Sequence, residues 1–154
     1  ALPISIGLEA YVVGYPLPSL QGANVKITDG IYNGEVITKR HRLFQISAQV
    51  QTGNSGGPVL SPDGLVMGVV QSKLDAMTVA QKTRDLPQNV NFAINSHVLI
   101  DFLSDTDIQL RVQSPQLGVT LRPYQILKLS SESVVMVLAA ERPPYAEKDP
   151  NQNP

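Results

Sequence analysis

The 154-residue sequence contains no cysteine, which excludes a disulfide scaffold, a cysteine nucleophile and zinc sites built on thiolates. Its 12 basic and 13 acidic side chains leave a formal net charge of −1, so the composition does not indicate a general nucleic-acid binder. No apolar run approaches the roughly 20 residues of a membrane-spanning helix. No stretch has the pattern of a secretory signal peptide, and the absence of a starting Met fits a processed or trimmed piece.

Glycine is distributed unevenly, because ten of the eleven glycines lie at or before Gly68. Short apolar runs between these glycines are typical of strands joined by tight turns. Turn signals include Asn33-Gly34 and the run from Ser61 to Gly64. Six strands at this spacing predict an all-β fold, either a small antiparallel barrel or a sandwich. The expected strands are residues 9–14, 25–32, 43–50, 57–60, 65–71 and 90–94.

Two helices are expected beside these strands. Residues 75–83 can form about two helical turns that end before Pro87. Asn95 and Ser96 offer a helix N-cap, and an apolar stripe follows at residues 98, 99, 102 and 103. This second helix is expected to end the first domain near residue 104.

The rest of the chain divides into an extension, residues 105–141, and a tail, residues 142–154. Residues 108–112 and 134–139 have the composition of strands, and residues 124–132 could form a helix after Pro123. The tail contains four of the twelve prolines and almost no apolar residues, so we expect it to be disordered.

The run Gly53-Asn54-Ser55-Gly56-Gly57-Pro58 carries the chemical information. A generic serine among glycines is usually only a flexible turn between strands. Here the glycines permit unusual backbone angles, and the N–H groups of Gly53 and Ser55 can point to one spot. A nucleophilic serine needs this arrangement, because its oxyanion must be met by convergent donors.

This GNSGGP run resembles the nucleophile signature of trypsin-like serine proteases, in the bacterial style of the high-temperature-requirement proteases. Residues 11–16, 27–31, 68–71 and 91–94 are also similar to strands of that family. The resemblance, which covers about residues 5–104, implies a six-stranded antiparallel Greek-key β-barrel, the second of two barrels, with a terminal helix. Residues 1–104 would form this domain.

The resemblance also implies roles for individual residues. Ser55 would be the nucleophile, and the N–H groups of Gly53 and Ser55 would form the oxyanion hole. Substrate would contact Gln49, Asn54, Gln71, Ser72 and Lys73. Gln49 would lie at the base of the specificity pocket, where a neutral side chain disfavours Lys or Arg. Gln71 to Lys73 would pair with the substrate backbone. The expected helix at 75–83 would either shape specificity or only pack over the barrel end.

A general base and its orienting carboxylate are missing from the pattern. In the family both come from the first barrel, which would precede Tyr11. His41 lies in a basic stretch and His97 at a helix start, while Asp29 and Asp63 belong to turns. None matches a catalytic position, and no spacing resembles a metal site, so we expect neither a metal nor a cofactor.

The sequence therefore predicts the C-terminal barrel of a serine endopeptidase that hydrolyses peptide bonds through Ser55. It would be inactive alone, because the His- and Asp-bearing first barrel lies outside it. The alternative is a non-catalytic, protease-like module that binds peptides by strand addition. A third possibility is a structural assembly domain. The resemblance favours a periplasmic or secreted location.

The expected partners are a polypeptide substrate and the missing N-terminal barrel, with no nucleic acid. The face between the barrels is expected to be apolar, which predicts dimerisation, strand exchange or cover by residues 105–139. We also expect the Ser55 turn to be present without a well-formed oxyanion hole, because the partner barrel is absent.

Overall fold

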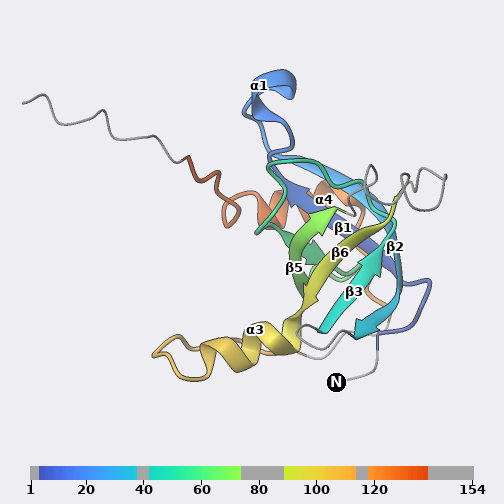
Figure 1. The fold of residues 1–154 in the computed structure, drawn as a ribbon, viewed down its shortest axis with the longest axis vertical. Helices are drawn as coiled ribbons and strands as arrows, with labels where there is room; N and C mark the ends of the chain where they lie inside the picture. Colours follow the sequence, from blue (N-terminus) through green and yellow to red (C-terminus); the bar gives the residue numbers. More distant parts are fainter. Residues whose placement is uncertain (1–3, 38–41, 74–88, 114–117, 139–154) are drawn as a thin grey trace, which may run out of the picture.

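The computed structural model describes residues 4–37, 42–73, 89–113 and 118–138. Six antiparallel strands close into a barrel in the order β1-β2-β3-β6-β5-β4, which confirms the predicted fold (Figure 1). The strands are β1 (Glu9–Gly14), β2 (Lys26–Ile37), β3 (Arg42–Ile46), β4 (Pro58–Leu60), β5 (Val66–Lys73) and β6 (Asn91–Asn95). In this order β3 and β4 lie on opposite sides of the barrel. The connection between them therefore has to cross one end of it.

The largest differences from the predicted strand boundaries are at the ends of β2 and β3. β2 continues through Asn33-Gly34, which the sequence presents as a turn. The strand absorbs these residues in a β-bulge, because Tyr32 pairs with Ile46 whereas Gly34 pairs with Gln45. β3 ends at Ile46 rather than at residue 50, since the chain leaves the ladder there to begin its crossing.

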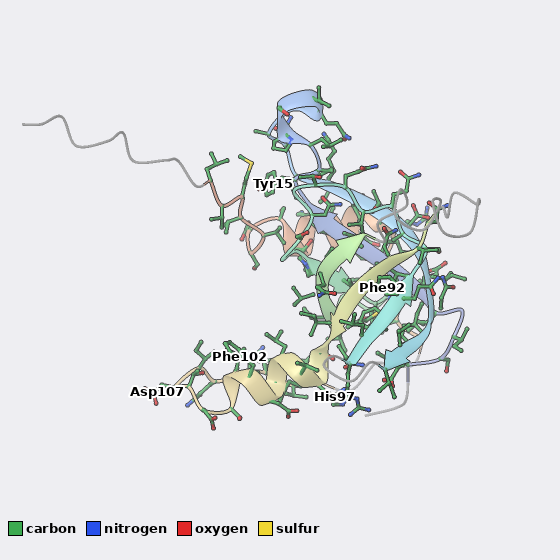
Figure 2. All side chains as sticks on the ribbon, viewed as in Figure 1. Tyr15, Phe92, His97, Phe102 and Asp107 are labelled. Atoms are coloured by element: carbon green, nitrogen blue, oxygen red, sulfur yellow. The ribbon has the colours of Figure 1, made fainter. Side chains whose placement is uncertain are left out.

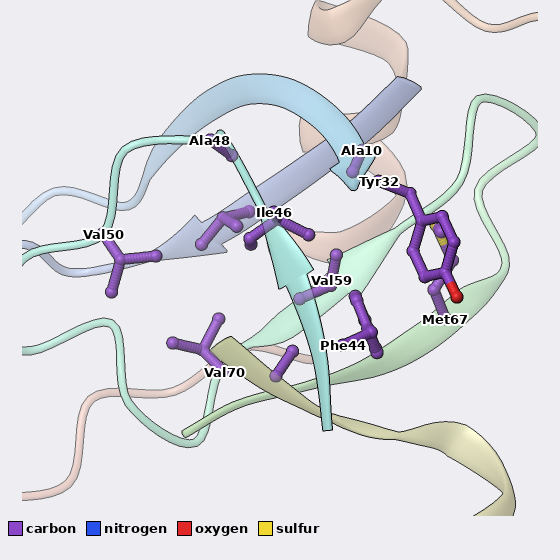
Figure 3. Packing of buried hydrophobic residues seen from close by; sticks show 11 residues of the cluster. Ala10, Tyr32, Phe44, Ile46, Ala48, Val50, Val59, Met67 and Val70 are labelled. Atoms are coloured by element: carbon purple, nitrogen blue, oxygen red, sulfur yellow. The ribbon is translucent and has the colours of Figure 1, made fainter. Parts of the chain in front are cut away.

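The interior of the barrel is filled by one apolar cluster (Figure 3). Phe44 and Ile46 are fully buried at its centre, and the rings of Phe44 and Tyr32 lie 5.4 Å apart. Ala48 and Val50, which follow β3, are also buried in this cluster. Burial raises the pKa of the Tyr32 phenol, and the nearby Glu35 carboxylate adds to the shift.

The second apolar cluster lies outside the barrel, under the helix α4 (Pro123–Ser130). Alternate residues of β1 face the two clusters: Val12 belongs to the inner one, while Tyr11 and Val13 belong to the outer one with Ile126. This explains why β1 is apolar at successive positions. A strand that is buried on both faces cannot alternate apolar with polar residues.

The described part of the extension agrees with the prediction in its helix and in part of its cover over the barrel. α4 is the expected helix at residues 124–132, beginning one residue earlier. Residues 108–112 and 134–138 form no strand, so these two predictions are wrong. A closed barrel offers no full-length edge strand with which either segment could pair. Residues 121–134 do cover the barrel, as expected for part of the extension, but residues 104–113 are exposed.

The helix α3 (Ser96–Leu103) begins where it was predicted, and the side chain of Asn95 accepts a hydrogen bond from the His97 N–H at 3.0 Å. It extends away from the barrel, and none of its residues is buried (Figures 1 and 2). Phe102 on its apolar stripe is 74% exposed. A short helix, α1 (Pro18–Gln21), was not predicted. The expected helix at 75–83 and the expected tail lie outside the described residues.

Two phenylalanines offer a matched test of the barrel core. Phe44→Ala is expected to lower the free energy of unfolding of this chain by about 3–5 kcal/mol, because it leaves a cavity at the barrel centre. Phe102→Ala removes an exposed ring and is expected to change it by less than about 0.5 kcal/mol. Urea unfolding followed by circular dichroism measures both. Equal losses would contradict the packing described.

The outer cluster has a similar pair in α4. Ile126 is fully buried against β1, whereas Leu129, one helical turn further on, is 66% exposed. Ile126→Ala is expected to destabilise the chain by about 2–4 kcal/mol in the same measurement, and Leu129→Ala by less than half as much. If Ile126→Ala leaves the unfolding midpoint unchanged, α4 does not pack on the barrel in solution.

Candidate active site

The connection from β3 to β4 carries Ser55 at the end of the barrel. Hydrogen bonds hold the first half of the crossing: Thr28 Oγ1 donates to the Gln49 carbonyl oxygen at 2.7 Å, and Asn91 Nδ2 donates to the Ala48 carbonyl oxygen at 2.7 Å. The N–H of Leu17 reaches the Thr52 carbonyl oxygen at 2.8 Å. The chain therefore enters the Ser55 turn from a fixed path.

The turn itself uses most of its backbone donors. The N–H of Asn54 donates to the Gln51 carbonyl oxygen at 3.0 Å, and the N–H of Gly57 to that of Asn54 at 2.9 Å. The N–H of Gly56 donates to the Val70 carbonyl oxygen at 2.8 Å, which ties the turn to β5. Within the described part of the chain, no backbone hydrogen bond uses the N–H of Gly53 or of Ser55. These are the two donors that the sequence assigns to an oxyanion hole.

Gly53 is required by the backbone on two counts. Its φ is +100°, in the region that favours glycine. A Cβ at this position would also overlap the carbonyl oxygen of Tyr15. The segment after β1 thus packs directly against the residue that precedes Asn54-Ser55.

Asn54 differs from its expected role. Its side chain is 2% exposed and lies against Gly14, where an added Cβ would come within 3.1 Å of the Asn54 Oδ1. This oxygen has no hydrogen-bond partner within the described residues. The Asn54 side chain is therefore not accessible to a substrate, and the predicted substrate contact is wrong for this side chain. It packs between the Ser55 turn and Gly14 instead.

Ser55 is exposed and opens onto a cleft of about 720 Å³. One wall comes from the barrel, including Tyr15 after β1, the turn from Gly53 to Pro58 and Val69 of β5. The other wall comes from the end of α4 and the segment after it, up to Leu138. None of the lining residues in the described part of the chain is charged, and none is histidine. The described lining of the cleft is therefore mainly apolar, and it includes Ser55 and Gly53.

Two of the other expected substrate contacts, Gln49 and Gln71, do not line this cleft. Gln49 is exposed on the crossing segment. Gln71 is the bulged residue of β5, because Val70 pairs with Ala93 and Ser72 with Phe92. In the described part of the structure Ser72 and Lys73 pair with β6, whereas the pairing of β5 with β4 ends at Val69. The roles of Gln49, Gln71, Ser72 and Lys73 stay predictions.

Asp63 and His97 lie where the sequence predicted, in a turn and at a helix start, whereas Asp29 lies in strand β2 and not in the predicted turn. His97 is exposed at the start of α3, with its Nδ1 2.9 Å from the capping oxygen of Asn95. Asp29 lies in the β1–β2 ladder opposite Tyr11, and Asp63 contacts the Ser61 hydroxyl in the predicted turn. His41 lies outside the described residues. Among the residues described, no three metal-ligating side chains cluster, and no helix is long and apolar enough to cross a membrane.

Comparison with known proteins relates this chain to the trypsin-like peptidases. The model of the trypsin-like peptidase domain family matches residues 1–69. The chain is 29% identical over 142 residues to the serine protease Do-like HtrA of Lactococcus lactis, covering 84% of this chain and 33% of that protein. It is 43% identical over 99 residues to the uncharacterized protein y4bJ of Sinorhizobium fredii, covering 64% of this chain and 16% of that protein. The chain thus spans a minor part of these relatives.

Solved structures share the fold at lower identity. The active form of the Rv3671c protease from M. tuberculosis superimposes with a TM-score of 0.53 at 22% identity, over 73% of this chain and 48% of that one. An HtrA-type protease, AlgW, crystallised with a decapeptide, gives a TM-score of 0.52 at 20% identity, over 66% and 29%.

Gly53 can be tested against a glycine that shares only its backbone angle. Gly22 also has a positive φ, of +80°, but a Cβ there would meet nothing within 4 Å. Gly53→Ala is expected to lower the free energy of unfolding by about 3 kcal/mol, because it adds overlap with a backbone carbonyl to the strain of the left-handed φ. Gly22→Ala is expected to cost about 1 kcal/mol. Urea denaturation compares the two variants, and equal costs would mean that the turn does not pack against Tyr15.

Proposed function

We propose that this chain, a relative of the trypsin-like serine proteases of the HtrA type, carries the nucleophile of a serine endopeptidase. The observation that supports this most directly is the turn around Ser55. An exposed hydroxyl stands beside two N–H groups, of Gly53 and Ser55, that the local backbone leaves unpaired.

The chemistry follows from this arrangement. The Ser55 Oγ would attack the carbonyl carbon of a peptide bond, and the carbonyl oxygen would take up the negative charge. The two N–H groups would stabilise that charge, each by about 3 kcal/mol. Expulsion of the amine would leave an acyl group on Ser55, which water would then hydrolyse.

A serine hydroxyl needs a base to remove its proton, and the described lining of the cleft offers neither a histidine nor a carboxylate. We therefore propose that the base and its orienting acid come from another lobe of the complete protein, and that the 154 residues alone do not hydrolyse peptides. The greater length of the relatives is compatible with this, since the chain covers 33% of the Lactococcus protease.

The polypeptide substrate would bind in extended form beside β5, next to the Ser55 turn, which the Gly56 N–H ties to the Val70 carbonyl oxygen. Such a peptide would be held by backbone hydrogen bonds. Gln49 would lie at the base of the neighbouring pocket.

The lack of a base in the described lining also supports a second candidate, a non-catalytic module that binds peptides without cleaving them. The same region beside β5 and the cleft would serve binding alone. This candidate requires that the complete protein also lack a suitably placed histidine.

Labelling with a fluorophosphonate probe separates the two functions. The complete protein is expected to react at Ser55, and Ser55→Ala is expected to abolish labelling and to lower kcat by about 10⁶-fold. Ser104→Ala, at the far end of α3, serves as the control and is expected to label normally. The 154-residue chain alone is expected not to label.

Absence of labelling in a folded complete protein would argue against the protease. If peptides then bind equally well to the native protein and to Ser55→Ala, and none is cleaved, the binding module is the better description.

A further inference from the structure

The Ser55 turn packs against the end of β1, a strand whose last residues are not part of the GNSGGP run. Gly14, the last residue of β1, lies against the side chain of Asn54, which precedes Ser55. The carbonyl oxygen of Val13 lies against Gly57, since a Cβ on Gly57 would come within 2.6 Å of it. Two consecutive residues of β1 therefore contact the turn on both sides of the nucleophile.

Packing sets the position of the Asn54 side-chain oxygen in the described structure. The side chain is 2% exposed, and its Oδ1 has no hydrogen-bond partner among the described residues. The backbone of Asn54 is held separately, because its N–H donates to the Gln51 carbonyl oxygen and its carbonyl oxygen accepts from the Gly57 N–H. The place of the amide thus depends on the atoms that surround it, and Gly14 is among them.

Gly14 provides room for Asn54 rather than an unusual backbone angle. Its φ does not lie in the left-handed region, so a residue with a side chain could adopt the same backbone conformation. An added Cβ would lie 3.1 Å from the Asn54 Oδ1 and 3.4 Å from the Asn54 Cα. The first distance is shorter than an ordinary contact, so Asn54 would have to move by a few tenths of an ångström.

Such a movement would reach the two free N–H groups of the turn. Asn54 lies between Gly53 and Ser55, and no backbone hydrogen bond in the described part of the chain uses the N–H of either residue. The Asn54 carbonyl carbon belongs to the same peptide group as the Ser55 N–H, and the N–H of Gly53 is one peptide group earlier. A shift of the Asn54 Cα would therefore turn both donors relative to each other. Donors of an oxyanion hole act only when they are accurately placed.

We infer that Gly14 is a positioning residue for the oxyanion hole. The absence of a side chain at this position seats Asn54, and the seated Asn54 directs the N–H groups of Gly53 and Ser55 to one point. The inference rests on the proposed protease function.

The first test compares two variants of the complete protein. Gly14→Ala is expected to lower kcat about tenfold and to leave KM unchanged, because displaced donors weaken the transition state and not the binding of substrate. Ile46→Val is the matched control, since it disturbs the barrel core but leaves the contact between Gly14 and Asn54 in place. It is expected to keep kcat. Hydrolysis of a fluorogenic peptide gives both constants.

A double-mutant cycle tests whether Gly14 acts through Asn54. Asn54→Ala removes the oxygen that the new Cβ would meet, and the remaining distance to the Cα, 3.4 Å, is an ordinary contact. Asn54→Ala alone is expected to lower kcat, because the turn loses its seat. Adding Gly14→Ala to this variant is expected to lower kcat by less than about twofold more. Losses that multiply would overturn the inference.

An unchanged kcat in folded Gly14→Ala would overturn the role of Gly14 and keep the protease, provided that Ser55 reacts with the fluorophosphonate. If Ser55 does not react, the amide ¹H–¹⁵N signals of Gly53 and Ser55 in the 154-residue chain decide. Shifts of these signals in Gly14→Ala, but not in Ile46→Val, would overturn the protease and keep the positioning of the turn. Unshifted signals would overturn both.

If Gly14→Ala does not fold, Asn54→Ala tests the same contact from its other side. It is expected to lower kcat with KM unchanged, and an unchanged kcat in this variant would overturn the inference.

Discussion

Closure of the six-stranded sheet is the constraint from which the rest of the molecule follows. Because β3 and β4 lie on opposite sides of the barrel, the chain between them must cross its end. Ala48 and Val50 use the crossing to complete the core, and side chains of β2 and β6 hold its carbonyl groups. The chain then turns outward before β4, and Ser55 lies on that turn. The position of the hydroxyl is thus a consequence of strand order.

Local patterns predicted most of the barrel. The six strands, α3 and α4 were recognisable because each depends on short-range periodicity, caps and turns. Asn33-Gly34 was wrongly predicted to be a turn. The pairing of β2 with β3 accommodates these residues in a bulge, which depends on the partner strand and not on local sequence. Residues 108–112 and 134–138 have strand-like composition, but a strand also needs a neighbour to pair with, and neither segment joins the closed barrel.

Some features of the candidate site could also be predicted from local sequence, and others could not. Ser55 and Gly53 could be predicted, because a serine in a tight turn that needs a left-handed glycine gives a short local sequence motif. The burial of Asn54 could not, because it depends on Gly14, forty residues earlier in the chain. The hydrogen bond from the Tyr15 hydroxyl to the Val134 carbonyl oxygen could not be predicted either. The cleft is lined by segments more than a hundred residues apart, such as those of Tyr15 and Val134. No local pattern in either segment indicates that they lie close together.

The two-sided burial of β1 has a consequence for the folding of the chain as a whole. Its inner face belongs to the barrel and its outer face to the cluster under α4, so the C-terminal helix and the barrel share a strand. Detaching the helix would hydrate Tyr11, Val13 and Leu60 together. The two parts are therefore a single cooperative unit, and the amide protons of β1 should be among the slowest to exchange with deuterated solvent.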